Sequence, residues 1–290
     1  MPHAQLIAAF DRPIIVVAAP RSGSTMLYEL LSKHPDFWTL GGEGHAHIEG
    51  VKGLKPDYEN RLSNRLKAEN LTNQTGSAVL ENFLLDMRDD KGRMLKDMAH
   101  GPNHFRFLEK TPKNALRIPF FDVLFKEARF VWLQRAPRGN ISSIIDAWRS
   151  GKFVTYRDLP GWRTLPWSLA LIEEWPALKT APLGLIATQQ WLSINNQIAA
   201  DLRQLPANRW LSVRYEDVLA DTPTSIKRIL DFAEVDPKAF PQEALTGTIA
   251  PSQYTLTAPD KEKWRRNAPD MAPHFADVDA ATALFEEMIS

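Results

Sequence analysis

Mostly apolar runs alternate with longer segments of mixed polarity along this chain. Five of the runs end at a turn residue or a polar side chain, which is typical of short buried strands. These predicted strands are residues 14–19, 37–40, 107–109, 129–134 and 210–213. Helices are expected over residues 25–33, 57–71, 78–85, 140–149, 186–204 and 222–234. Either Asp221 or Thr222 is expected to cap the last of them.

The alternation of strands and helices predicts an α/β fold. A central parallel sheet, like that of P-loop proteins, is expected to be flanked by helices on both faces. The chain has 290 residues, which suits a single domain over residues 1–290 that carries insertions. Helical or irregular lid insertions are expected at about residues 45–105 and 151–185.

Composition narrows the possible functions. The 35 basic and 35 acidic residues give a formal net charge of zero, which argues against a general nucleic-acid binder. There are no cysteines, so disulfides, thiolate catalysis and cysteine-bound metals are excluded. The first apolar run is too short to cross a membrane, and no signal-peptide pattern precedes it. We therefore expect a cytoplasmic protein without a transmembrane anchor.

The segment PIIVVAAPRSGST, from Pro13 to Thr25, carries the strongest functional signal. An apolar strand, a loop of small residues and a helix start form an anion cradle, because their backbone N–H groups converge on one oxyanion. Gly23 and Thr25 match the P-loop pattern, but the first glycine is missing and Ser24 replaces the lysine. Arg21 supplies the positive charge instead. The loop therefore predicts a phosphate-like ligand that is not a magnesium-bound triphosphate.

A polar side chain follows each of the five predicted strands. These residues are Arg21, Glu43, Lys110, Arg135 and Tyr215. In open parallel sheets, ligands bind at the carboxyl ends of the strands. We therefore expect these side chains to belong to one site.

The segment RAPRGNISS, from Arg135 to Ser143, is a second candidate anion site. Ser143 lies on the predicted helix, so both side chains can reach one anion if the helix lies beside the strand end. The PRSGST loop, the Gly-Glu pair after the second strand, LEKTPKN, RAPRG and VRYEDVL occur in that order. This order resembles the sulfotransferases that use 3′-phosphoadenosine-5′-phosphosulfate (PAPS), in the branch that contains the tyrosylprotein sulfotransferases.

The resemblance implies a PAPS cofactor whose product is 3′-phosphoadenosine-5′-phosphate (PAP). Its 5′-phosphosulfate is expected to bind to the first loop, at Arg21, Ser22, Gly23, Ser24 and Thr25. No metal is expected, because the departing 5′-phosphate carries fewer charges than a triphosphate and no acidic metal-binding strand follows the loop.

In the resembled family, the 3′-phosphate is held by an arginine and by a serine eight residues later, which match Arg135 and Ser143. Tyr215 is expected to contact the adenine or to close over the nucleotide, with a buried core tyrosine as the alternative. A basic cluster near the C-terminus is expected to close on the 3′-phosphate, unless it forms a solvated basic face. Its members are Lys261, Lys263 and Arg265.

Sulfuryl transfer requires positive charge near the leaving oxygen and a base for the acceptor hydroxyl. Arg21 and Lys110 are the expected cations. Glu43 is the expected base, because it lies between glycines after a strand and matches the catalytic glutamate of the resembled branch. His45 is the alternative base, since other branches of the superfamily use histidine. His47 is a third candidate, placed at the substrate.

The acceptor is expected to be small or lipid-like, either an alcohol or a phenol. Trp162 and Trp167, in an excursion rich in proline and tryptophan, are expected to line an apolar acceptor pocket, unless this loop packs on itself. The family likeness leaves a peptide tyrosine possible, and a sugar hydroxyl stays open. Two other functions remain as alternatives. One is a P-loop kinase or a related phosphoryl-transfer enzyme, and the other is a non-catalytic binder of phosphoadenosine nucleotides.

Overall fold

In the computed structural model, which describes residues 3–56, 62–163, 165–246, 254–256, 260 and 262–289, one parallel sheet lies at the centre. Its five strands have the order β2-β3-β1-β4-β7. They are β1 Ile14–Val17, β2 Phe37–Trp38, β3 Arg106–Lys110, β4 Arg129–Gln134 and β7 Trp210–Arg214. Each predicted strand is present, and the predicted α/β fold class is confirmed.

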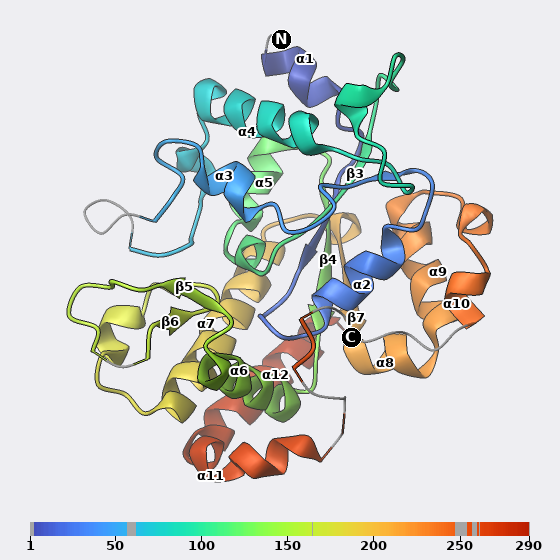
Figure 1. Cartoon of the computed structure of the whole chain (residues 1–290). Helices are drawn as coiled ribbons and strands as arrows, with labels where there is room; N and C mark the ends of the chain where they lie inside the picture. Colours follow the sequence, from blue (N-terminus) through green and yellow to red (C-terminus); the bar gives the residue numbers. More distant parts are fainter. Residues whose placement is uncertain are drawn as a thin grey trace.

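The sheet is covered on both faces. Successive side chains of each strand point to opposite faces, so alternate residues of one strand belong to different cores. Ile14 and Val16 belong to a core that includes α2 (Ser24–Leu31) and α9 (Thr222–Ala233). Ile15 and Val17 belong to a larger core built with α5 (Ile118–Leu124), α6 (Pro137–Ser150) and α7 (Leu183–Leu202). In Figure 1, α9 lies to the right of the sheet and α7 to its left.

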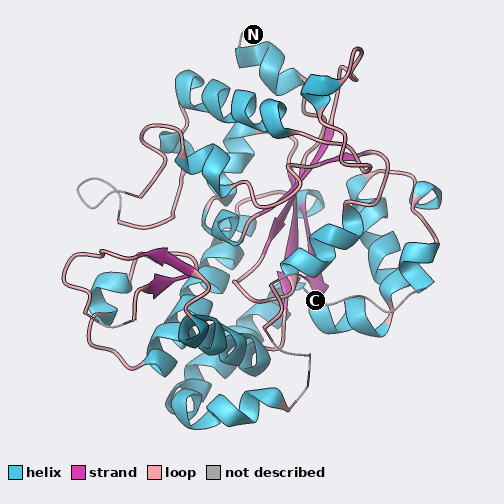
Figure 2. Cartoon of the chain, in the orientation of Figure 1, coloured by secondary structure: helices cyan, strands magenta, loops and turns pink. Residues whose placement is uncertain are grey.

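The remaining helices surround this sheet (Figure 2). They are α1 His3–Ala8, α3 His45–Glu49, α4 Asn73–Asp86, α5 Ile118–Leu124, α6 Pro137–Ser150, α7 Leu183–Leu202, α8 Tyr215–Ala220, α10 Glu243–Thr246, α11 Ala268–Met271 and α12 Phe275–Ile289. Short 3₁₀ helices include Ala68–Asn70, Pro112–Leu116 and Lys263–Asn267. None of the helices in the described residues is long and apolar enough to cross a membrane.

Most helix predictions hold, with shifted ends. Asp221 caps α9, as its side chain accepts a hydrogen bond from the backbone N–H of Thr224 at 3.1 Å. Of the helix predicted over residues 57–71, residues 57–61 lie outside the described residues, residues 62–67 are not helical, and only the 3₁₀ turn at 68–70 is present. The backbone bonds of residues 62–67 go to distant segments instead: the N–H of Asn64 donates to Leu171, and that of Leu66 to Leu116.

The insertion predicted over residues 151–185 is more regular than expected. It contains an antiparallel pair, β5 (Val154–Tyr156) and β6 (Trp167–Ser168), which lies apart from the main sheet (Figure 2). The other predicted insertion contains α3 and α4. Both insertions therefore supply ordered elements beside the carboxyl ends of the strands.

Candidate active site

The loop between β1 and α2 has a backbone shape that depends on close packing. Arg21 has φ 67° and Gly23 has φ 91°, both in the left-handed region. A Cβ atom on Gly23 would lie 2.5 Å from the ring of Tyr215. Only glycine therefore allows this φ and this approach together. The loop leads into α2, whose first backbone N–H groups have no partner within the helix and can bind an anion.

Ser22 holds the loop from inside. Its Oγ lies 2.8 Å from the carbonyl oxygen of Ala19 and 2.9 Å from Oδ1 of Asn140 on α6. Asn140 in turn donates from Nδ2 to the carbonyl oxygen of Pro20 at 2.8 Å. Because the Ser22 side chain is buried and engaged in this way, the structure does not place it against a ligand.

A cavity of about 700 Å³ opens beside this loop. That volume lies within the roughly 300–1,000 Å³ typical of small-molecule sites. Its walls bring together most of the residues that the sequence singled out, namely Arg21, Gly23, Ser24, Thr25, Glu43, His45, Arg135, Ser143, Tyr215 and Lys263. The strand-end residues thus converge as expected, and Lys110 lies just beneath this surface with about 1% of its area exposed.

Arg21 is oriented across the cavity by contacts from two distant segments. Its guanidinium carbon lies 4.6 Å from the ring centroid of Phe153, and Nη2 donates to the carbonyl oxygen of Tyr254 at 2.8 Å. Burial and the nearby Arg135 lower the pKa of Arg21. Its Nε is buried and has no hydrogen-bond partner among the described residues. An anion in the cavity would satisfy this donor.

Arg135 forms the second basic point of the cavity. It donates from Nη1 to the carbonyl oxygen of Arg21 at 2.8 Å, and its guanidinium lies 5.0 Å from the ring centroid of Tyr215. Ser143, one turn and more along α6, lines the same cavity. Lys263 reaches it from the C-terminal region, and burial together with Arg266 lowers the pKa of Lys263. Arg21, Arg135 and Lys263 thus form a group of neighbouring basic side chains in the cavity wall.

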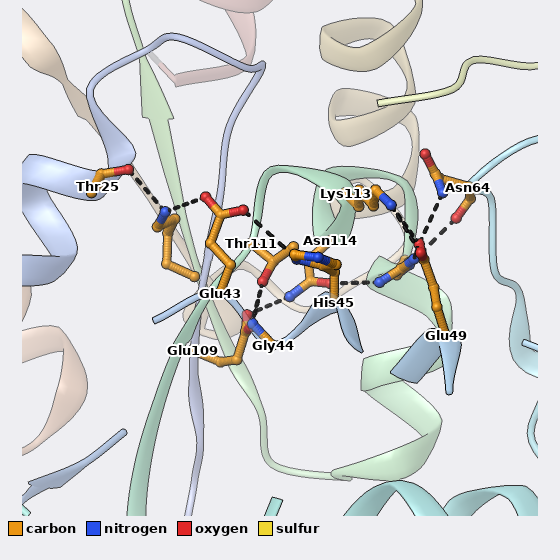
Figure 3. Close-up of polar contacts among 12 residues, drawn as sticks. Thr25, Glu43, Gly44, His45, Glu49, Asn64, Glu109, Thr111, Lys113 and Asn114 are labelled. Atoms are coloured by element: carbon orange, nitrogen blue, oxygen red, sulfur yellow. Dashed lines mark hydrogen bonds and ion pairs between the residues drawn. The ribbon is translucent and has the colours of Figure 1, made fainter. Parts of the chain in front are cut away.

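Lys110 connects the anion loop to Glu43. Its Nζ donates to Oγ1 of Thr25 at 2.9 Å and to Oε1 of Glu43 at 2.8 Å (Figure 3). His45 lies further away, with its Nδ1 3.9 Å from the other oxygen of Glu43. Burial and the positive charge of Lys113 lower the pKa of His45. An acid, a buried cation and a helix-start hydroxyl thus meet at one point.

Glu109 is a fully buried acid behind this point. Its Oε1 accepts hydrogen bonds from the backbone N–H of Gly44 at 3.0 Å and from Oγ1 of Thr111 at 2.7 Å, while Oε2 accepts from Nδ2 of Asn114 (Figure 3). Burial raises the pKa of Glu109 to about 7, against the opposing effect of Thr111, the Gly44 N–H and Lys110. Gly44 directly follows Glu43 in the chain.

A second buried acid, Glu49, lies at the end of α3. Lys113 donates to both of its oxygens at 2.9 Å, Arg117 donates at 2.6 Å and Asn64 at 3.1 Å. Burial acts to raise the pKa of Glu49, but Arg117 and Lys113 outweigh it and hold the pKa below its usual value. Lys113 lines the cavity, so this ion cluster forms part of its wall.

Several predicted residues lie elsewhere. Trp167 is fully buried and packs its ring against Trp162 and Trp148, with centroids 5.0 Å and 5.2 Å away, so the loop packs on itself as in the alternative. Neither Trp162 nor Trp167 is among the residues that line the cavity. His47 donates to Asp86 at 2.9 Å instead of facing the cavity.

The C-terminal basic cluster is only partly at the site. Lys263 lines the cavity, whereas Arg265 pairs with Glu262 and lies over the ring of Trp264, with 5.6 Å to its centroid. Lys261 lies outside the described residues.

Other site residues were not found from the sequence. Phe153 and Tyr254 line the cavity through aromatic side chains in segments that carry no motif. Glu109 and Asn114 lie within the quoted LEKTPKN segment, but nothing in that segment alone shows that they reach Gly44. Their roles depend on contacts that only the folded chain creates.

Comparison with known proteins agrees with this geometry. A family model described as "Sulfotransferase family" matches residues 13–239. A protein of Caenorhabditis briggsae named "Putative protein-tyrosine sulfotransferase" is 24% identical over 144 residues, which are 49% of this chain and 45% of that protein. The chain thus matches less than half the length of this curated relative.

One solved sulfotransferase has a similar fold, and a second match is weaker. The crystal structure of a sulfotransferase from Alicyclobacillus acidocaldarius superposes with a TM-score of 0.50 at 15% identity, covering 93% of this chain and 95% of that one. A sulfotransferase domain from the curacin biosynthetic pathway gives a TM-score of 0.48 at 19% identity, covering 89% and 96%.

Proposed function

The chain belongs to the sulfotransferase family, and from that premise we propose that it transfers a sulfuryl group from PAPS to an acceptor hydroxyl. The observation that carries the proposal is the position of Lys110, between Thr25 at the start of α2 and the carboxylate of Glu43. This arrangement places a cation at the anion loop and a base beside it. These are the groups that sulfuryl transfer requires.

The residues present fit a nucleotide with two anionic ends. The buried, unpartnered Nε of Arg21 and the first N–H groups of α2 suit the phosphosulfate. Arg135, Ser143 and Lys263 suit a second phosphate. Tyr215 packs against Gly23 and lies near the guanidinium of Arg135, where its ring can support a purine.

When bound, PAPS supplies the activated sulfuryl group. Lys110 and Arg21 would stabilise negative charge on the leaving oxygen, because both cations are fixed in place beforehand. Lys110 is almost fully buried, so its charge acts with little screening by water. Phe153 and the Tyr254 carbonyl hold Arg21 in the orientation that this role needs.

Glu43 is the proposed base. It accepts the acceptor's proton through the carboxylate that faces the cavity, and Lys110 keeps that carboxylate oriented. His45 lines the cavity too, but Glu43 contacts the proposed leaving-group cation Lys110 directly, whereas Nδ1 of His45 lies 3.9 Å from Oε2 of Glu43. We therefore assign His45 to the acceptor wall and keep Glu43 as the base.

We propose an uncharged acceptor, either an alcohol or a phenol with an apolar body. Lys113 is a further cation in the cavity wall, but an ammonium group has three N–H donors. In the described structure, these face both oxygens of Glu49 and the hydroxyl of Tyr156, at 2.9, 2.9 and 3.3 Å. No donor is then left for an anionic acceptor. The opposite wall is apolar and contains Phe153, Leu169, Ala170, Tyr254 and Leu256.

An acceptor screen tests this function. Purified protein is incubated with PAPS and a panel of phenols, long-chain alcohols, sugars and a tyrosine peptide, and PAP release is followed. We expect release that depends on a phenol or alcohol and that continues in EDTA. Turnover of ATP with Mg²⁺, and none of PAPS, would replace the proposal with phosphoryl transfer. PAP binding without transfer to any acceptor would support a non-catalytic binder.

A further inference from the structure

Two consecutive residues of β3 approach the Glu43 turn from different sides. Side chains alternate along a strand, so Glu109 and Lys110 point to opposite faces of the sheet. Lys110 reaches the carboxylate of Glu43, and Glu109 reaches the backbone N–H of Gly44. The side chain of Glu43 and the peptide that follows it are thus held by neighbouring positions of one buried strand.

We propose that Glu109 is a positioning residue for sulfuryl transfer: it anchors the Gly44 peptide and so fixes the carboxylate of Glu43 at the cavity. This inference rests on the proposed function, in which Glu43 is the base. Glu109 does not line the cavity, so it acts through the turn and not on the substrate.

The contact with Gly44 is close and specific. The N–H of Gly44 lies 3.0 Å from Oε1 of Glu109 and 2.8 Å from Oγ1 of Thr111, so it is shared between two acceptors. A Cβ atom on Gly44 would lie 2.6 Å from Oε1 of Glu109 and 2.7 Å from Leu40. Gly44 has φ −82°, which any residue can adopt. The glycine is therefore required by the approach of Glu109 and Leu40, and not by the backbone angle.

The charge on Glu109 also has a reason in this arrangement. Three donors point at its carboxylate, from Gly44, Thr111 and Asn114. A glutamine of the same shape has one oxygen and one NH₂ group, so it cannot accept at both ends. The NH₂ group of the glutamine would then face either the donors of Gly44 and Thr111 or the NH₂ group of Asn114. To avoid this contact, the turn or Asn114 would have to move.

Asn114 connects Glu109 to Arg117, beside the acceptor wall. Its Oδ1 lies 3.4 Å from Nη1 of Arg117, which donates from Nη2 to Glu49 at 2.6 Å. Glu49 in turn holds Lys113 at the cavity. In Figure 3, Glu109, Asn114 and Glu49 lie along this path of contacts. Loss of the Glu109 charge is therefore expected to displace the carboxylate of Glu43. Through Asn114 and Arg117 it is also expected to displace the Glu49–Lys113 pair at the cavity wall.

The test is Glu109→Gln, assayed at about pH 8, above the raised pKa of Glu109, so that the wild-type carboxylate is ionised. We expect kcat per PAP-binding site to fall by about 10- to 100-fold, because a small misplacement of a reacting group has an effect of that size. The Kd for PAP should change by less than about threefold, because the anion sites are untouched. The stoichiometry of PAP binding corrects for any misfolded fraction.

Asp201→Asn is the matched control. Asp201 is also a buried acid, and its two carboxylate oxygens lie 2.5 and 2.7 Å from the guanidinium of Arg65. Unlike Glu109, it does not touch the Glu43 turn, and it does not line the cavity. It should lower the melting temperature and leave kcat per PAP site unchanged. An equal fall of kcat per site in both variants would reduce Glu109 to a structural acid and overturn the inference.

A double-mutant cycle separates positioning from general damage. Gly44→Ala presses against the same carboxylate, so it should lower kcat like Glu109→Gln, and the two losses should not add in the double variant. Fully additive losses, or a Glu109→Gln enzyme with wild-type kcat, would overturn the inference. If Glu109→Gln yields no protein that binds PAP, Thr111→Val tests the same anchor and should give a smaller fall. A wild-type protein that transfers no sulfuryl group would instead disprove the proposed function.

Discussion

Lys110 Nζ lies 2.8 Å from Oε1 of Glu43, so the proposed base and the proposed leaving-group cation form an ion pair. The side chain of Lys110 is about 2% exposed and that of Glu43 about 24%. The cation is thus fixed inside the protein, while the carboxylate reaches into the cavity. Such a pair orients both groups before substrates bind.

Glu43→Gln should lower kcat by about 10²- to 10⁴-fold, which is the range for loss of a general base. The Kd for PAP should stay nearly constant, because the amide keeps an oxygen for Lys110. His45→Asn is the comparison, and it should keep most of kcat. The reverse pattern, with His45→Asn inactive and Glu43→Gln active, would assign the base to His45.

Arg135→Ala should weaken PAP binding by roughly 10- to 100-fold, as expected when a hydrogen bond to a charged group is lost. Binding of 5′-AMP, which has no 3′-phosphate, should be much less affected. Arg138→Ala is the matched control, because Arg138 lies three residues later at the start of α6, pairs with Asp279 and does not line the cavity. Titration calorimetry measures all three proteins. Equal losses for PAP and 5′-AMP would move Arg135 away from the 3′-phosphate.

Tyr254→Ala should raise the KM of an aromatic acceptor by about tenfold, the equivalent of roughly 1.4 kcal/mol of lost apolar contact. Its ring centroid lies 6.4 Å from that of Phe153 and 5.9 Å from Nζ of Lys110, beside the proposed reaction centre. Tyr254→Phe keeps the ring and should keep the KM. Initial rates at saturating PAPS provide the measurement. An unchanged KM in Tyr254→Ala would remove the ring from the acceptor wall.

Glu109 should make stability depend on pH. Below about pH 4.5, its carboxyl is protonated in the folded and unfolded states alike. As the pH rises toward about 7, the unfolded state releases the proton and the folded state keeps it, so the free energy of unfolding falls. The free energy of unfolding of Glu109→Gln does not fall in this way, because the glutamine does not titrate. The melting temperature of Glu109→Gln minus that of wild type should therefore increase between about pH 4.5 and pH 8. A difference that stays constant with pH would contradict the raised pKa.

Local signals explain which parts of the fold and site were predictable. The five strands and the PRSGST loop follow from short runs of sequence, and neighbouring parallel strands place Arg21, Lys110 and Arg135 at one edge. The site depends also on contacts across long separations, which no local pattern reveals. Arg21 and Tyr254 are 233 residues apart, and Ser22 and Asn140 are 118 apart.

The incorrect predictions have the same cause. Residues 62–67 have a sequence compatible with a helix, but their backbone pairs with the segments around Leu116 and Leu171. Trp162 and Trp167 were expected at the acceptor pocket because large aromatic side chains often line ligand sites. Their rings pack on each other and on Trp148 instead, which buries more apolar surface than an open pocket would.

Titration calorimetry with PAP in EDTA, with ATP as the control, tests the central claim most directly. We propose that Arg21 and the start of α2 bind the 5′-phosphosulfate, that Arg135 and Ser143 bind the 3′-phosphate, and that this binding uses no metal. We expect PAP to bind tightly at one site per chain and ATP to bind far more weakly. Absence of PAP binding, or binding of ATP that appears only with Mg²⁺, would contradict the assignment of this protein as a PAPS-dependent sulfotransferase.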